Sequence, residues 1–311
     1  MTDLFYRNLG SSGLKISKLG LGTDQVIKNK EYKELIKCIK CAFNNGINYF
    51  DAADSYVDGN AEEILGGALK YFSRGDYIVS SKCFFPRSII PSNSGLSRKH
   101  LYDSVHKSLS NFGLDYIDIY YFHRYDNSTS LYESMSAISD LIKSGKVLYW
   151  GVSRFGIEQI REIVTLLEIH PHLIPPICNQ WYYNIVSREI ENELVDYCVA
   201  NGIGMIAYSP LKRGLFSEKS MKLIPDNDQF FSNLSLTNKQ ALDLLKKLSL
   251  ISRPLDLSLS QLAMGWVLFN KKITSTLSGF RNESQLLESI SIAKNNLDED
   301  VYQNINELLC Y

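Results

Sequence analysis

Short apolar runs alternate with stretches of helical periodicity along most of the chain. The segments 47–50, 77–81 and 116–122 are short and mainly apolar, which is typical of strands covered on both faces. The segment 31–44 places apolar residues three or four positions apart and ends at an Asn-Gly pair, which predicts a helix with a clear stop. Strands that alternate with helices in this way predict a parallel sheet.

The same reading extends over the rest of the sequence. We expect strands at 19–22, 47–50, 77–81, 116–122, 147–152, 176–179, 204–208 and 275–277. We expect helices at 31–44, 61–72 (with Asn60 as N-cap), 97–112, 130–143, 157–169, 189–200, 238–252, 258–270, 283–295 and 298–309. Most strands follow one another at roughly thirty residues, the size of one strand-helix unit, and the units do not repeat in sequence.

Eight such units favour an α/β fold of the (β/α)8 TIM barrel class, because a doubly wound sheet usually has fewer strands. Two apolar stretches, 4–9 and 14–19, flank a Gly-Ser-Ser-Gly turn and predict an N-terminal β-hairpin. Extra helices are expected between the seventh and eighth strands, after a loop at 226–236, and at the C-terminus. We expect residues 1–311 to form a single domain.

Composition and charge restrict the possible partners. The chain is 45% hydrophobic and 22% charged, which is ordinary for a globular protein, and its net charge is −1. A balance so close to neutral predicts neither nucleic acid nor membrane as a partner. Without an apolar signal segment near the start, and without an apolar run long enough to span a bilayer, the cytoplasm is the expected compartment.

The cysteines and histidines do not form a pattern typical of metal sites. Six scattered cysteines are not a disulfide framework, and Cys38 and Cys41 lie within a predicted helix. His170 and His172 have no partner ligands nearby in the sequence. We therefore predict no metal site.

Four ionisable side chains follow the ends of three predicted strands. Asp51 ends the second strand and Tyr56 comes five residues later, while Lys82 and His123 follow the third and fourth strands. Parallel barrel strands have their carboxyl ends on one face, so these four side chains are expected to meet there. A nearby ammonium favours the phenolate and would lower the pKa of a phenol. An acid, a phenol, an amine and an imidazole at one place indicate proton-transfer chemistry.

The motifs around these residues resemble the aldo-keto reductase superfamily. The resemblance rests on FDAADSY at 50–56, SSKC at 80–83, YFHR at 121–124, GLSRKH at 95–100, YWGVSR at 149–154, LIPPICNQ at 173–180 and YSPL at 208–211. It covers nearly the whole chain. It is strongest to the branch that contains bacterial glyceraldehyde-phosphate-type reductases and the beta subunits of voltage-gated potassium channels.

The resemblance implies an NADPH-dependent oxidoreductase that reduces an aldehyde or ketone to an alcohol. In that family the tyrosine that matches Tyr56 protonates the carbonyl oxygen as hydride arrives from the nicotinamide. Lys82 and Asp51 would tune the pKa of this tyrosine, and His123 would orient the carbonyl.

The resemblance also implies a set of residues for the cofactor NADP(H). Ser153, Arg154, Asn179 and Gln180 would lie at the carboxamide, with Tyr208 stacked on the nicotinamide and Thr23 at its edge. Around the pyrophosphate would lie Ser209, Pro210, Leu211, Lys212 and Gly214. Near the adenosine would lie Gly279, Arg281, Gln285 and Glu288, with Arg281 on the 2′-phosphate. A glycine-rich Rossmann fingerprint is absent from the sequence.

Two other functions remain open at this point. One is a nucleotide-binding regulatory subunit like the channel beta subunits, which usually carry Asn at the place of His123 and often a long N-terminal extension. The other is a cofactor-free lyase that uses Lys82 as a Schiff base. The sequence predicts a small carbonyl compound as substrate without identifying it, and it leaves the oligomeric state open, a homo-oligomer included.

Overall fold

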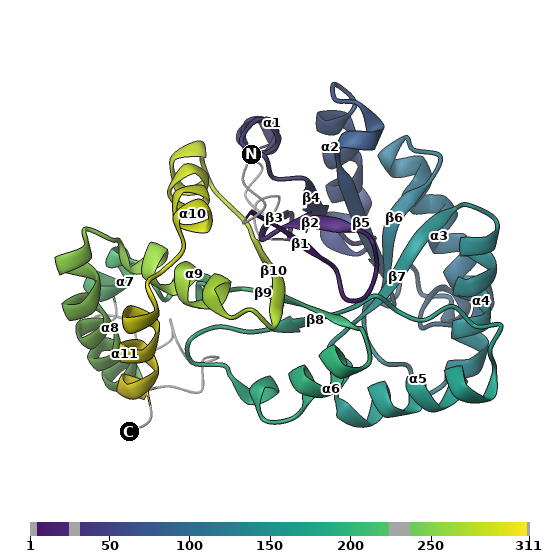
Figure 1. The fold of residues 1–311 in the computed structure, drawn as a ribbon. Coiled ribbons are helices and arrows are strands. Elements are labelled where there is room, and N and C mark those ends of the chain that lie inside the picture. Colours follow the sequence, from purple (N-terminus) through teal and green to yellow (C-terminus); the bar gives the residue numbers. More distant parts are fainter. Residues whose placement is uncertain (1–4, 25–31, 224–236, 310–311) are drawn as a thin grey trace.

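A computed structural model describes residues 5–24, 32–223 and 237–309. Its eight parallel strands close into a barrel in the order β10-β3-β4-β5-β6-β7-β8-β9, which confirms the predicted TIM barrel (Figure 1). The strands are β3 (Leu19–Gly22), β4 (Tyr49–Asp51), β5 (Ile78–Cys83), β6 (Ile117–Phe122), β7 (Val147–Ser153), β8 (Cys178–Tyr182), β9 (Gly204–Tyr208) and β10 (Ile273–Ser278).

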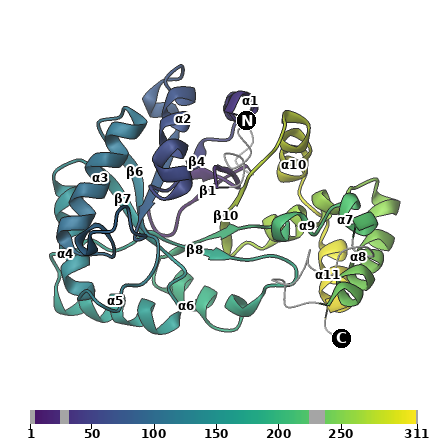
Figure 2. The ribbon, with the colours of Figure 1, turned by 180° about the vertical axis from the view of Figure 1, so that it is seen from behind.

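Helices cover the outside of the barrel. They are α1 (Tyr32–Asn44), α2 (Asn60–Leu69), α3 (Arg98–Phe112), α4 (Leu131–Lys143), α5 (Ile157–Ile169), α6 (Leu194–Ala200), α7 (Glu218–Leu223), α8 (Asn238–Ser252), α9 (Leu259–Phe269), α10 (Glu283–Asn295) and α11 (Glu299–Leu309). Helices α7, α8 and α11 gather at one side of the molecule, next to α9, in both views (Figures 1 and 2). Within the described residues, no helix has both the length and the apolar character required to cross a bilayer.

The predicted N-terminal hairpin is formed by β1 (Tyr6–Asn8) and β2 (Lys15–Ser17). Leu9 and Ile16 are fully buried among the side chains that fill the barrel interior. Gly10, at φ 59°, lies against the strand starts so closely that an added Cβ would come within 2.2 Å of the Gly202 carbonyl oxygen. The hairpin therefore closes the end of the barrel at which the strands begin, and leaves the other end for a site.

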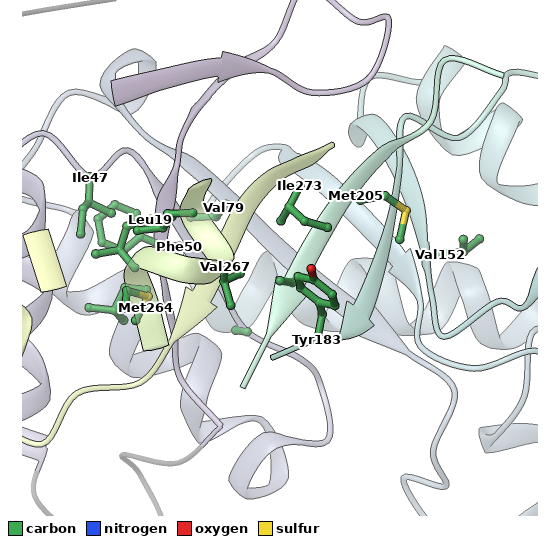
Figure 3. Packing of buried hydrophobic residues seen from close by; sticks show 14 of the residues in the cluster. Leu19, Ile47, Phe50, Val79, Val152, Tyr183, Met205, Met264, Val267 and Ile273 are labelled. Carbon is green, nitrogen blue, oxygen red and sulfur yellow. The ribbon is translucent and has the colours of Figure 1, made fainter. Parts of the chain in front are cut away.

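The core has two layers because side chains alternate along each strand. The outer layer packs the strands against the helices, and Figure 3 shows members of it from the strands (Leu19, Phe50, Val79) and from α9 (Met264, Val267). The inner layer fills the barrel itself. It contains Leu9, Ile16, Tyr49, Ile78, Ile119, Tyr121, Ile177, Cys178, Ile206 and Leu277.

Several predicted boundaries need correction. β8 begins two residues later than expected and continues to Tyr182, because Pro175 and Pro176 cannot donate to a strand ladder. Asn60 is the first residue of α2 rather than its N-cap, which is Gly59 at φ 92°. The expected helix 189–200 is divided into a 3-10 turn at Glu189–Glu191 and α6. α7 was not predicted, and the whole of the predicted loop 226–236 lies outside the described residues.

Candidate active site

A buried ion pair lies at the carboxyl ends of β4 and β5. The Nζ atom of Lys82 is 2.5 Å from Oδ2 of Asp51, and both side chains are almost completely removed from solvent. The same ammonium donates to the Ala52 carbonyl oxygen at 2.7 Å and to the Tyr56 hydroxyl at 3.4 Å. Three members of the predicted group thus meet as expected, with Lys82 at the centre and its three N–H donors each directed at an acceptor.

Asp51 is held by neutral donors as well as by the ammonium. Its Oδ1 accepts from Ser80 Oγ at 2.6 Å and from Gln180 Nε2 at 3.3 Å. Its backbone carbonyl accepts from Thr23 Oγ1 at 3.0 Å. These contacts fix both the carboxylate and the end of β4, and they place Thr23 and Gln180 next to the group formed by Asp51, Lys82 and Tyr56.

The predicted direction of the Tyr56 pKa is wrong. The ring is half-buried and its hydroxyl is turned inward toward Lys82. Burial raises the pKa of Tyr56 well above its ordinary value, and the Asp51 carboxylate acts in the same direction. Lys82 is itself buried, which lowers its pKa against the opposing effect of Asp51. Tyr56 is therefore a protonated, neutral phenol beside a cation.

His123 completes the group. Its ring centroid is 5.9 Å from that of Tyr56 and 4.9 Å from that of Phe85, both in edge-on geometry. Burial, together with the positive charges of Lys82 and Arg124, lowers the pKa of His123 to about 2. The imidazole is thus neutral, and within the described residues its Nδ1 has no hydrogen-bond partner. With its one N–H on Nε2, the neutral ring would be able to donate to a ligand atom.

Of the four residues expected at the carboxamide, Ser153 and Gln180 lie on the inward face of the strands and are both buried. Arg154 follows at φ 59°, a left-handed conformation that is unfavourable for arginine. The expectation that Asn179 lies at the carboxamide needs correction, because the alternation of side chains along β8 turns Asn179 to the outer face of the barrel. There its Nδ2 donates to the Phe155 carbonyl oxygen at 2.8 Å and supports the loop that carries Arg154.

The loop after β9 combines backbone strain with positive charge. Ser209, Lys212 and Arg213 all have positive φ, which costs energy in residues other than glycine. Lys212 is buried, with its Nζ 2.9 Å from Ser187 Oγ, and it forms no ion pair with any described residue. The other predicted residues lie along the same segment: Tyr208 half-buried at the end of β9, with its ring 5.5 Å from that of Tyr182, Pro210 buried, Leu211 half-buried and Gly214 exposed.

The start of α10 provides a second anion-binding feature. Asn282 caps the helix by accepting from Gln285 N, and Gln285 Oε1 accepts from Arg281 N at 3.1 Å. The side chain of Arg281 is exposed, and no described residue forms an ion pair with it. Gly279, Gln285 and Glu288 are exposed around it, at a helix start where backbone N–H groups favour anions.

Two contacts of the site were not predicted. Ser80 donates directly to Asp51, and Arg124 is half-buried above Phe85, its guanidinium 5.5 Å from the ring centroid. Ser80 had a signal in the sequence, since it precedes Lys82 by two positions and so lies on the same face of β5. Arg124 follows His123 directly, and nothing in the sequence predicts that it folds back to the His123 carbonyl.

The described cysteines are free thiols. Cys38 and Cys41 lie in α1, as predicted. No group of three or more potential ligands among His, Cys, Asp and Glu occurs in the part of the chain that the structure describes.

The chain is similar to known proteins over almost its whole length. The sequence model of the Aldo/keto reductase family matches residues 18–309. A probable voltage-gated potassium channel subunit beta of Arabidopsis thaliana is 35% identical, over 92% of this chain and 90% of that protein. A putative voltage-gated potassium channel subunit beta of Schizosaccharomyces pombe is 33% identical, over 98% of this chain and 93% of that protein. The strand-end residues and these matches agree, and the chain belongs to the aldo/keto reductase family.

Proposed function

We propose that the protein is an NADPH-dependent reductase of a small aldehyde or ketone. The observation that carries the proposal is the contact of the Lys82 ammonium, ion-paired with Asp51, with the hydroxyl of Tyr56 at the open end of the barrel. When bound, the dihydronicotinamide would supply the hydride. The residues of this chain would hold the carbonyl and provide the proton.

Tyr56 is suited to give its proton late in the reaction. As hydride reaches the carbonyl carbon, the oxygen becomes an alkoxide, which is a stronger base than a phenolate. A neutral phenol can therefore protonate it even though its own pKa is raised. The phenolate that remains is stabilised by the Lys82 ammonium, an electrostatic contribution that develops only as the proton leaves.

His123 would act as a hydrogen-bond donor. A neutral imidazole with its proton on Nε2 can donate to the carbonyl oxygen and orient it toward Tyr56. Because the ring is uncharged, it does not compete with Tyr56 as the source of the proton.

The residues present fit a phosphorylated dinucleotide. Lys212, which is buried and forms no ion pair with any described residue, and the strained loop around it favour a bound pyrophosphate, and Arg281 at the start of α10 favours a further phosphate. Ser153 and Gln180 present polar groups toward the barrel mouth at the height of the catalytic group. The proposed assignment is nicotinamide near Gln180 and the 2′-phosphate near Arg281.

A second candidate function comes from the relatives. They are named as potassium channel subunits, so the protein could instead be a nucleotide-binding subunit of a channel complex. The two candidates share the cofactor site and differ in turnover. The lyase alternative is disfavoured, because Lys82 is fully buried and holds its three donors on Asp51, Ala52 and Tyr56.

The decisive experiment is a panel of aldehydes, ketones and sugars assayed by the loss of NADPH absorbance, with NADPH binding measured by fluorescence in parallel. The proposal predicts turnover of at least one class of carbonyl compound. Tight NADPH binding without turnover of any compound would favour the channel-subunit function. Absence of NADPH binding would overturn both.

A further inference from the structure

A layer of four polar side chains lies directly below the candidate site, inside the barrel. Each stands two positions before a site residue that lies on the same strand or, for His123, directly after it, so alternation places it on the same inward face. All four are fully buried. The pairs are Tyr49 with Asp51, Ser80 with Lys82, Tyr121 with His123, and Cys178 with Gln180.

These side chains form one continuous sequence of hydrogen bonds, which we call the hydroxyl chain. Cys178 Sγ is 3.2 Å from Tyr121 Oη, which is 2.9 Å from Tyr49 Oη. Tyr49 Oη is 3.3 Å from Ser80 Oγ, and Ser80 Oγ is 2.6 Å from Oδ1 of Asp51. The hydroxyl chain thus runs from the middle of the barrel to the carboxylate that pairs with Lys82.

The number of hydroxyl hydrogens determines which group donates and which accepts at each step of the hydroxyl chain. An ionised carboxylate only accepts, so the single hydroxyl hydrogen of Ser80 goes to Asp51. In its 3.3 Å contact with Tyr49 the Ser80 oxygen is also placed as the donor, but its one hydrogen is taken by the shorter contact with Asp51. Tyr49 must then supply the hydrogen of that contact and accept from Tyr121, which accepts from the Cys178 thiol. Every O–H dipole of the hydroxyl chain is therefore aligned toward Asp51, and such dipoles strengthen one another in a low-dielectric interior.

The far end of the hydroxyl chain is closed. Cys178 lies in the inner layer with Leu9 and Ile16 of the plugging hairpin, away from solvent. Burial raises the pKa of Cys178 to about 12 and that of both tyrosines well above their ordinary value. The hydroxyl chain consequently keeps its hydrogens and acts as a set of fixed dipoles rather than as a route for protons.

We propose that Ser80, Tyr49 and Tyr121 are positioning residues of the reductase, which hold the Asp51 carboxylate in the orientation in which Asp51 in turn holds the Lys82 ammonium against Tyr56. This inference rests on the proposed function. Its physical basis is that a buried carboxylate needs several hydrogen-bond donors. Lys82 donates to Oδ2 of Asp51, so Oδ1 needs other donors. The alternative is that the two tyrosines serve only to pack the core. In that case phenylalanine would replace either of them without effect on activity, because it fills the same space.

The test uses the purified full chain with Ser80→Ala, Tyr49→Phe and Tyr121→Phe, and Tyr120→Phe as the matched control. Tyr120 is also fully buried in β6 but belongs to the outer layer, away from Asp51. We expect kcat to fall about tenfold in Ser80→Ala and several-fold in the two tyrosine variants, at unchanged KM for the carbonyl and unchanged NADPH affinity. Ser80→Thr, which keeps the hydroxyl, should restore most of kcat.

Two further results separate a connected chain from packing. The double variant Ser80→Ala/Tyr49→Phe should be no slower than Ser80→Ala, because the hydroxyl chain is already cut. The 13C resonance of the Asp51 carboxyl, assigned with Asp51→Asn, should shift in all three chain variants and stay in place in Tyr120→Phe. This second readout needs no substrate, so it tests the hydroxyl chain even if the wild-type protein reduces no carbonyl compound. Resonances and kcat values equal to those of the control would overturn the inference.

Discussion

Lys82 and Asp51 form an ion pair of 2.5 Å between Nζ and Oδ2, from which solvent is almost completely excluded. Each charge would be costly to bury alone. Separating the two side chains would leave an uncompensated charge in the interior, so the fold favours the paired arrangement. Because Lys82 also touches Tyr56, the geometry of this pair determines where the proposed acid stands.

Breaking this pair from one side should destabilise the fold. In Lys82→Met the carboxylate of Asp51 remains buried without its cation, and we expect the free energy of unfolding to fall by about 3–5 kcal/mol. Urea denaturation measures this. In the double variant Lys82→Met/Asp51→Asn the buried charge is gone, so the loss should be smaller than the sum of the two single losses. Additive losses would show that the two charges do not depend on each other.

The pH dependence of turnover should carry no contribution from His123. Its pKa of about 2 keeps the ring neutral over the whole working range. We expect the profiles of kcat/KM for the wild type and His123→Asn to have the same shape between about pH 5 and 8, with the variant lower by about 10–100-fold. An inflection near an ordinary histidine pKa, present in the wild type and lost in the variant, would refute the neutral assignment.

Asp54 should make the fold less stable as the pH rises. Its carboxylate is buried, neither oxygen has a hydrogen-bond partner among the described residues, and burial raises its pKa to about 7. Between the unfolded pKa near 4 and this value the native state binds the extra proton, so stability present at low pH is lost through this window.

Asp54→Asn, which resembles the protonated form, should remove that loss. We expect the variant to match the wild type near pH 4 and to exceed it by roughly 2–4 kcal/mol at pH 8. Denaturation curves at several pH values measure the difference. A difference that does not change with pH would contradict the raised pKa of Asp54.

Arg281 should select between the two nicotinamide cofactors. Its guanidinium at the start of α10 is exposed, has no ion-pair partner among the described residues and is placed for a phosphate. Arg281→Ala should weaken NADPH binding by about tenfold or more and leave NADH binding nearly unchanged. Arg253→Ala, at another exposed arginine, serves as the charge-matched control. Equal weakening of both cofactors would contradict the assignment.

The sequence predicted the elements whose signals are local. Helices α5, α8 and α10 begin and end as expected, because apolar periodicity and end signals agree there. The convergence of Asp51, Lys82 and Tyr56 also followed from strand order, since parallel strands share one carboxyl end.

Properties that depend on burial could not be predicted from local signals in the sequence. The pKa of Tyr56 is decided by how deeply the hydroxyl is covered, and this outweighs the nearby cation. Asn179 and Gln180 are adjacent in sequence and chemically alike. Only the exact start of β8 determines that Gln180 faces Asp51 while Asn179 faces Phe155.

The central claim is that the Tyr56 hydroxyl delivers the proton during carbonyl reduction. It is tested most directly by comparing wild type and Tyr56→Phe in single-turnover oxidation of bound NADPH by a carbonyl compound that the wild type reduces, with NADPH affinity measured in parallel. The account predicts a rate lowered by about 10²–10⁴ at near wild-type affinity. A variant that retains most of the wild-type rate would contradict it.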